Sequence, residues 1–340
     1  PITLPKIGSM TAPSGYKFVG WDYTRMVDDA SKTTTYPADA YFYIERDGIV
    51  LTAKWIPTSQ TMYLIETYMQ LPDGQYEQEE TVVGIDAGTG NIVYTPEAKR
   101  GYTINSENSK LTVARADGAK ILVYYDSLKY DVEFNTNGAP GGDENGVFRT
   151  MQAAYGSNVS GVPNAAALNA GQNNKYFRFV GWFDEADTIS NPDAQMIDTT
   201  TVVNERTLRN EAGENTADPG AKLVAYAKWT PLNNAQITFD YAYKNHAQGA
   251  VRSDKRTLTP IYDSTCTGLY SYNAKPSGFP VTPSAWKDTS GNVYTFVEWR
   301  IDPEDPATAV NASTVLQNYE DVTVTAIWTE SYSVSRSYRG

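Results

Sequence analysis

The side chains that most often carry out chemistry in enzymes are scarce in this sequence. It holds one histidine, His246, and one cysteine, Cys266, so a Ser–His–Asp or Cys–His arrangement can only run through them. His246 lies in the polar stretch YKNHAQG and Cys266 in DSTCTG, and neither stretch carries the motif of a catalytic nucleophile. We therefore expect an exposed loop histidine, a small and partly buried cysteine, and no catalytic residue.

Metal binding is restricted in the same way, because one histidine and one cysteine cannot supply a site rich in these ligands. Calcium needs only oxygen ligands, and acidic loops occur at 184–193, 141–146 and 302–306. None of them follows the EF-hand pattern. We expect ordinary polar turns, with a weak structural calcium left open for 184–193, and predict no metal site and no cofactor. The glycines of 85–91 lack the Lys-Ser/Thr of a phosphate-binding loop.

The composition limits the class of protein. The 28 basic and 40 acidic residues give a formal charge of −12, which repels phosphate backbones, so we expect no nucleic-acid partner. No apolar run approaches the roughly 20 residues that cross a membrane. The 25 tyrosines, together with frequent Thr and Val, favour strands over helices. A single cysteine excludes an internal disulfide bond.

One six-residue phrase occurs three times and indicates how the chain is built. The copies are YKFVGW at 16–21, FRFVGW at 177–182 and YTFVEW at 294–299. Each is followed by a second phrase that ends in Trp. These second phrases are LTAKW at 51–55, VAYAKW at 224–229 and VTAIW at 324–328. The stretches between the two phrases differ in length, which predicts two core strands joined by a tolerant surface loop.

The alternation within the phrases predicts antiparallel strands with one buried face. In the first copy it puts Phe18 on one face, and Val19 and Trp21 on the other. In the phrase that follows, Ala53 and Trp55 share a face. Both phrases are typical of half-buried antiparallel strands.

Other signals surround these phrases. Strands are predicted at 130–134 and 237–241, before the second and third copies, whereas no such strand precedes the first copy. Between 61 and 127 a different unit occurs, with a hairpin at LPDGQY and another pair of strands around ADGA. The segment 302–318 predicts one short helix capped by Asp305 or a neighbour.

These segments resemble two known families of repeats. The opening strand, the aromatic phrase and the final A-K-W resemble internalin-B-type B repeats, also called Listeria–Bacteroides repeats. Through YLIETYMQ, DGQY and GYTINSENSK…ILVYYD, 61–127 is similar to a mucin-binding-protein (MucBP-like) repeat. The third copy departs from the B-repeat pattern, with Glu298 for Gly and Ile327 for Lys. The resemblance implies a β-grasp-like, ubiquitin-like fold and a cell-wall-anchored surface protein of a Gram-positive-type bacterium.

We therefore predict a mainly β (α+β) chain of small tandem β-grasp-like modules arranged as an elongated rod. The predicted parts are a B-repeat-like module truncated at its N-terminus (1–56), a MucBP-like module (61–127), a B-repeat-like module (129–231), a divergent B-repeat-like module (235–330) and a tail or start of a next module (331–340). The linkers between the modules are short, so we expect limited freedom between them. We expect the chain to be a piece of a longer protein.

For function, we predict a non-enzymatic stalk or adhesive segment of a secreted bacterial cell-surface protein. It would be extracellular and attached to the cell wall through regions outside this segment. Expected partners are its neighbouring modules and a host surface glycan or protein. An alternative is a glycan- or protein-binding module that uses exposed loop aromatics. An enzyme or enzyme-accessory region is the third reading, against which the shallow surfaces of small modules argue.

Overall fold

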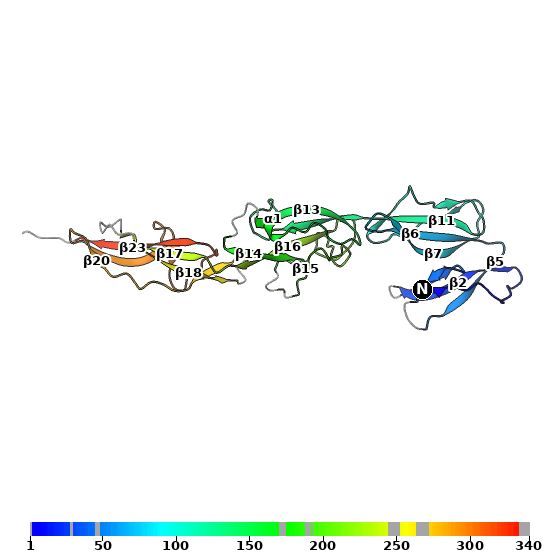
Figure 1. Ribbon diagram of the computed structural model, residues 1–340, viewed down its shortest axis with the longest axis horizontal. Coiled ribbons are helices and arrows are strands. Elements are labelled where there is room, and N and C mark those ends of the chain that lie inside the picture. The colour runs from blue at the N-terminus through cyan, green and yellow to red at the C-terminus, as the bar shows by residue number, and fades with distance from the viewer. Residues whose placement is uncertain are drawn as a thin grey trace, which may run out of the picture. The chain divides into compact units, whose positions relative to one another are not determined.

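The computed structural model describes residues 2–27, 30–44, 48–169, 175–187, 191, 193–243, 252–262 and 272–332. The chain is mainly β (Figure 1), as its sequence predicts. It divides into two compact units. The first comprises 1–132, 152–160 and 200–223, and the second 133–151, 161–199 and 224–340. No helix in the described ranges is long and apolar enough to cross a membrane.

The first unit holds a three-stranded and a four-stranded sheet. The three-stranded sheet has the order β3 (Ala30–Tyr36), β2 (Tyr16–Val27), β5 (Leu51–Pro57), and β1 (Ile2–Thr3) pairs with β4 (Tyr41–Phe42) beside it. The four-stranded sheet has the order β7 (Tyr76–Asp86), β6 (Thr61–Gln70), β11 (Ala119–Ser127), β9 (Tyr102–Ile104). A separate pair is formed by β8 (Ile92–Val93) and β10 (Thr112–Val113).

The predicted hairpin at LPDGQY is confirmed, and two strands flank ADGA as predicted, although their main partners are other strands. Between β6 and β7, the Leu71 amide donates to the Gln75 carbonyl at 2.7 Å. The segments on either side of ADGA meet at one antiparallel bridge, between Lys110, just before β10, and Leu122 of β11. The strand before it, β10, pairs with β8, whereas β11 lies between β6, to which it is parallel, and β9. Its apolar residues Ile121 and Val123 are fully buried, and an inner position in the sheet provides that burial.

A five-stranded sheet includes strands that run from one unit into the other. Its order is β13 (Val147–Ala154), β12 (Lys129–Asn135), β16 (Lys222–Pro231), β14 (Phe177–Phe183), β15 (Met196–Ile197). The short helix α1 (Ala165–Asn169) precedes β14. The strand predicted at 130–134 is thus confirmed as β12.

The second unit also holds a seven-stranded sheet. Its order is β19 (Asn273–Pro276), β18 (Ser253–Ile261), β17 (Gln236–Asp240), β23 (Val322–Ser331), β21 (Val293–Arg300), β20 (Trp286–Lys287), with β22 (Ala309–Val310) on β21. The first strand β17, predicted from ITFDY, pairs in parallel with the last strand β23. The predicted short helix is the 3₁₀ turn Pro306–Thr308, whose N-cap Asp305 accepts a hydrogen bond from the Ala307 amide.

The repeated phrases form the same structure three times. Each aromatic phrase pairs antiparallel with its Trp-ended phrase, and in each the register shifts by one residue directly after the Phe. This shift is a β-bulge, in which an extra residue of one strand has no partner on the other. In the first copy the extra residue is Val19. The bulge overturns the strict alternation that the sequence predicts, because it brings Phe18 and Trp21 to the same face, 5.5 Å apart between ring centroids.

In every copy, the Phe ring contacts both Trp rings, edge to face in five of the six pairs and tilted between Phe296 and Trp299. We call each such set an aromatic triad. The triads are Phe18, Trp21 and Trp55; Phe179, Trp182 and Trp229; and Phe296, Trp299 and Trp328. The six centroid distances lie between 5.3 and 5.8 Å. Such pairs contribute about 0.5–1.5 kcal/mol each beyond the area that they bury.

The residue after the bulge explains why the third copy tolerates a change of sequence. Gly20 has a φ of +152°, and a Cβ built there would lie 2.2 Å from the Tyr36 carbonyl oxygen. The equivalent Gly181 has no such φ, and its Cβ would make ordinary contacts at 3.5 Å or more. In the third copy, Glu298 occupies this position and forms a 2.7 Å ion pair with Arg300. Only the first copy therefore requires glycine here.

We expect Gly20→Ala to lower the free energy of unfolding by about 2 kcal/mol or more, because it adds a backbone clash to an unfavourable φ. The matched variant Gly181→Ala should change it by less than about 0.5 kcal/mol. Urea unfolding followed by tryptophan fluorescence measures both. Equal effects of the two substitutions would show that the bulge geometry does not set the requirement for glycine.

Candidate functional site

The residues that the sequence singled out for chemistry do not come together in a site. His246 and Cys266 both lie outside the described residues. Within the described ranges, no three His, Cys, Asp or Glu side chains are grouped as metal ligands would be.

The acidic loops perform the turn chemistry that was predicted for them. In the loop that begins at Asp184, of which 188–190 and 192 are not described, Asp184 Oδ1 accepts a hydrogen bond from the Gln195 amide at 2.7 Å. Asp143 Oδ1 accepts from the Val147 amide at 2.8 Å. Asp302 Oδ1 accepts from an amide two residues later at 3.0 Å. The Asp143 and Asp302 carboxylates thus cap local turns, as short polar side chains commonly do, whereas the Asp184 bond joins residues eleven positions apart.

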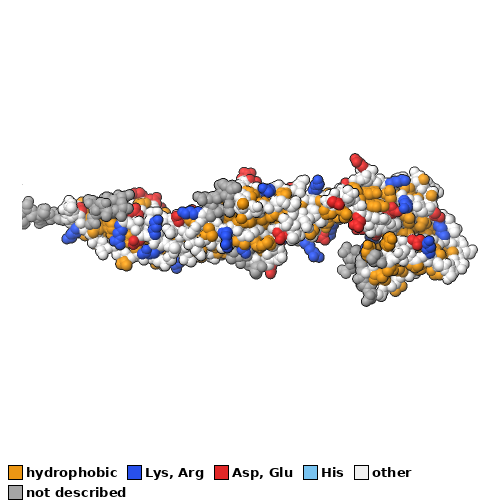
Figure 2. All heavy atoms as spheres, in the orientation of Figure 1, with side chains coloured by type: hydrophobic (Ala, Val, Ile, Leu, Met, Phe, Trp, Pro, Cys, Tyr) orange, Lys and Arg blue, Asp and Glu red, His pale blue; other side chains and the backbone are white. Residues whose placement is uncertain are grey.

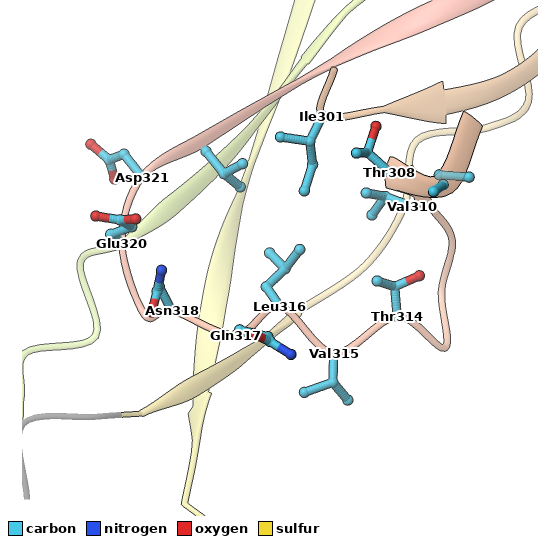
Figure 3. Close-up of a pocket in the computed structure, with 13 residues that line it drawn as sticks. Ile301, Thr308, Val310, Thr314, Val315, Leu316, Gln317, Asn318, Glu320 and Asp321 are labelled. Carbon is cyan, nitrogen blue, oxygen red and sulfur yellow. The ribbon is translucent and has the colours of Figure 1, made fainter. Parts of the chain in front are cut away.

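A hollow of about 380 Å³ lies beside the crossover between β21 and β23 (Figure 3). Its wall is largely apolar, with Ile301, Val310 and Leu316 pointing toward the space, and two carboxylates, Glu320 and Asp321, stand at one end. The described residues that line it include no His, Cys, Ser or Lys.

The connection between the four-stranded and five-stranded sheets is held by backbone hydrogen bonds. The amide of Leu128 donates to the Gly101 carbonyl at 2.9 Å, and the Leu128 carbonyl accepts from the Tyr155 amide at 2.8 Å. The Tyr155 ring packs edge to face on Tyr102 at 5.3 Å. Its hydroxyl donates to Glu205, and burial together with this hydrogen bond raises the pKa of Tyr155 to about 12. The linker is therefore anchored on both sides and is not a free tether.

Gly101 is required for this close approach. Its φ is +78°, and a Cβ there would lie 2.4 Å from the ring of Tyr155. A larger residue would force the Tyr155 ring away from the linker. We call the contacts of 101–102, 127–128 and 155 the first joint.

A second joint connects the five-stranded and seven-stranded sheets within the second unit. Leu232 donates its amide to the Tyr176 carbonyl at 2.8 Å, and the Gln236 amide donates to Asp321 Oδ1 at 2.8 Å. Lys175 forms an ion pair with the same Asp321. The Tyr319 ring lies edge to face on an aromatic ring of β14, 5.8 Å away. Backbone, charge and aromatic contacts thus all hold the linker.

The carboxyl of Asp321 in the second joint has a shifted pKa. Burial raises its pKa, but hydrogen bonds from Lys175 and from the Gln236 amide outweigh that effect, so the pKa lies below its ordinary value. A carboxyl whose pKa is lower in the folded chain stabilises the fold above its unfolded pKa, and the stabilisation is lost as the pH falls through the folded pKa.

An ion pair also joins the three-stranded and four-stranded sheets of the first unit. Lys17 Nζ lies 2.5 Å from Asp117 Oδ2, and Asp117 Oδ1 accepts the Met62 amide at 3.0 Å. The Lys17 hydrogen bond lowers the pKa of Asp117, and the Met62 amide lowers it further.

In the first unit, a groove of about 290 Å³ is lined by aromatic and charged side chains. The lining residues are Tyr23, Arg25, Tyr36, Tyr41, Phe42, Tyr43, Glu79, Glu80 and Lys99. Tyr41 is 77% exposed and Tyr43 69% exposed, so both rings are open to a ligand. Lys99 pairs with Glu79, and burial raises the pKa of Glu80. Flat aromatic faces beside carboxylates are suited to stack on a sugar ring and accept its hydroxyls.

No local pattern in the sequence predicted this groove. In the Y-F-Y stretch at 41–43, Phe42 is buried and both tyrosines are exposed. Over the visible face in Figure 2, acidic and basic side chains are interspersed and do not gather into a basic patch.

The comparisons with known proteins add no relative: no family model matches the chain, and no curated protein matches it.

We expect Asp321→Asn to lower stability at pH 7 by about 0.5–1.5 kcal/mol, because it removes the charge that pairs with Lys175 at a partly exposed site. The difference from the unmodified protein should shrink as the pH falls through the folded-state pKa of Asp321, which lies below its ordinary value. Thermal unfolding at a series of pH values from 7 downward measures it. Glu304→Gln, an exposed carboxylate in the same unit, is the control. A difference that does not shrink as the pH falls would contradict the role of the charge.

Proposed function

We propose that this chain is a non-enzymatic stalk or adhesive segment of a bacterial cell-surface protein, built from small β-grasp-like modules that follow one another along an elongated rod. The modules proposed are 61–127, 129–231 and 235–330, preceded by an incomplete module at 1–56. It acts outside the cell, held to the cell wall by other regions of its protein. Its resemblance to internalin-B-type B repeats and to a MucBP-like repeat supports the proposal.

The observation that carries the proposal is the threefold repetition of the aromatic triad. The register, the bulge and the contacts of one Phe ring with two Trp rings recur in three different sheets. A chain that repeats one small core gains length with each copy and needs no central pocket. The strand order gives a second support. In two of the proposed modules, the first and last strands of the sheet lie side by side and run parallel, namely β6 with β11 and β17 with β23. That neighbour relation is typical of a β-grasp fold.

The two joints support a mechanical role. A stalk that holds another domain away from a surface must resist bending at its linkers. In both joints, the backbone groups of the linker are hydrogen-bonded to the sheets that it connects. Each such bond contributes about 0.5–1.5 kcal/mol and limits rotation about the linker. The joints are thus where stiffness would be set.

The proposal predicts that a flexible insertion at a joint shortens the molecule on average. A twelve-residue Gly/Ser segment, which behaves as a flexible random coil, placed between Leu232 and Asn233 should broaden the distance distribution in small-angle X-ray scattering and shift its weight to shorter distances. The same segment between Pro72 and Asp73, in a hairpin loop, is the control and should leave the distribution nearly unchanged. A compact globule in the unmodified protein would contradict the rod.

A second candidate function is supported by the groove beside Tyr41 and Tyr43. This reading makes the chain a glycan-binding module whose exposed aromatic rings stack on sugars. Stacking of this kind is worth about 0.5–1.5 kcal/mol per ring.

A glycan array probed with the whole chain tests this reading. Binding should fall about tenfold in the double variant Tyr41→Ala/Tyr43→Ala, and stay unchanged in Tyr332→Ala, an equally exposed tyrosine elsewhere. If no glycan on the array binds, the glycan-binding function of the groove is contradicted and the stalk function remains.

A further inference from the structure

The hollow beside the crossover between β21 and β23 has walls that are fixed by backbone hydrogen bonds (Figure 3). On one side, the Ile301 amide donates to the Thr308 carbonyl at 3.1 Å, and β22, which holds Val310, pairs with β21. On the other side, the amide and the carbonyl of Leu316 each bond to Ala274 of β19 at 2.8 Å. Because both walls are held in this way, the space is preformed, and a ligand does not have to order the loop on binding.

The inner surface of the hollow is aliphatic. Figure 3 shows Ile301 and Leu316 pointing toward each other across it. Ile301 is 44% exposed, so its side chain is open to a ligand. The described lining holds no aromatic ring, the group on which sugars stack, and the hydroxyls of Thr308 and Thr314 already take part in hydrogen bonds within the loop. The hollow therefore favours an apolar group over a sugar.

The polar end of the hollow carries a carboxylate that is available to a ligand. Asp321 is engaged in the second joint, where it accepts the Gln236 amide and pairs with Lys175. Among the described residues, the carboxylate of the neighbouring Glu320 forms no hydrogen bond and no ion pair. The lining residues in the described ranges include no Lys and no Arg. This end of the hollow thus offers a charged acceptor to a cation.

We propose that the hollow binds a small amphiphilic amine. The apolar part of the ligand lies between Ile301 and Leu316, and its protonated amine stands beside Glu320. The volume of about 380 Å³ is within the range of small-molecule sites, which are commonly apolar with a few polar groups that fix the orientation of the ligand. The carboxylate repels an anion, so charge complementarity selects a cation. This site lies in the proposed module 235–330 and depends on neither the stalk nor the glycan function proposed above.

Three probes of similar shape separate the contribution of the charge from that of the apolar group. They are 3-phenylpropylamine, 3-phenylpropan-1-ol and 3-phenylpropanoate, titrated into the whole chain at low salt and followed by the NMR shifts of backbone amides. The amine should shift the amides of 301, 310, 316 and 320, and bind about threefold to fivefold more tightly than the alcohol, as expected for one exposed ion pair. The carboxylate probe should bind more weakly than the alcohol. Equal binding of the amine and the alcohol, or shifts centred on other residues, would overturn the proposal.

A substitution at the polar end tests the role assigned to Glu320. Glu320→Gln should lower the affinity for the amine to that for the alcohol, and leave the affinity for the alcohol unchanged, because only the amine uses the charge. Glu304→Gln, at an exposed carboxylate outside the lining, is the control and should change neither affinity. If the amine still binds more tightly than the alcohol in Glu320→Gln, the proposed site is wrong.

A substitution at the mouth tests the apolar part. Ile301→Lys places a cation beside the apolar wall and should abolish binding of the amine. Val297→Lys, at a comparably exposed position of β21 outside the lining (49% against 44%), is the control and should bind the amine as the unmodified protein does. Thermal unfolding of both variants checks that the fold is retained. Undiminished binding of the amine by Ile301→Lys would place the ligand elsewhere and overturn the proposal.

Discussion

Each repeated sheet depends on the contact of one phenylalanine with two tryptophans across a β-bulge. Without the bulge, the Phe and the first Trp would face opposite sides of the strand, and the second Trp could contact only one of them. The extra residue turns both rings to the same face. There they meet the second Trp, which stands directly opposite the Phe on the neighbouring strand. The phrase is therefore a unit of packing, which explains why its ends recur while the loops between them vary.

Positions of the phrase outside the triad are held by weaker and different interactions. The residue before the final Trp is Lys54 in the first copy, where it lies 3.3 Å from Asp22. Its counterpart Lys228 lies 5.1 Å from the ring of Phe183, and Ile327 carries no charge. Exposed ion pairs and cation–π contacts contribute about 1 kcal/mol or less. The positions at which the third copy departs from the pattern, Glu298 and Ile327, therefore contribute little to stability.

The sequence predicts local features of this fold better than distant ones. The repeated strands, the LPDGQY hairpin and the Asp305 cap follow from signals within a few residues, and all are present. The bulge was not predicted, because strict alternation places successive residues on opposite faces and allows for no extra residue. The partner of β11 was missed because parallel pairing with β6 joins segments more than fifty residues apart. The contacts at Tyr155 and Asp321, and the exposure of Tyr41, are tertiary, so no local pattern carries them.

The sheets differ in how their edge strands are protected. A β-protein must protect its edge strands, and short strands or covering segments are common means. The strands β9, β15 and β20 close one edge of their sheets with only two or three residues each. In the three-stranded sheet both edges have seven residues, and β3 packs beside β7. In the two larger sheets a further strand covers the triad, with Phe134 of β12 on Trp182 and Phe239 of β17 on Trp299. The contact of one Phe with two tryptophans therefore forms the core of each hairpin, and in these two sheets a separate strand buries it.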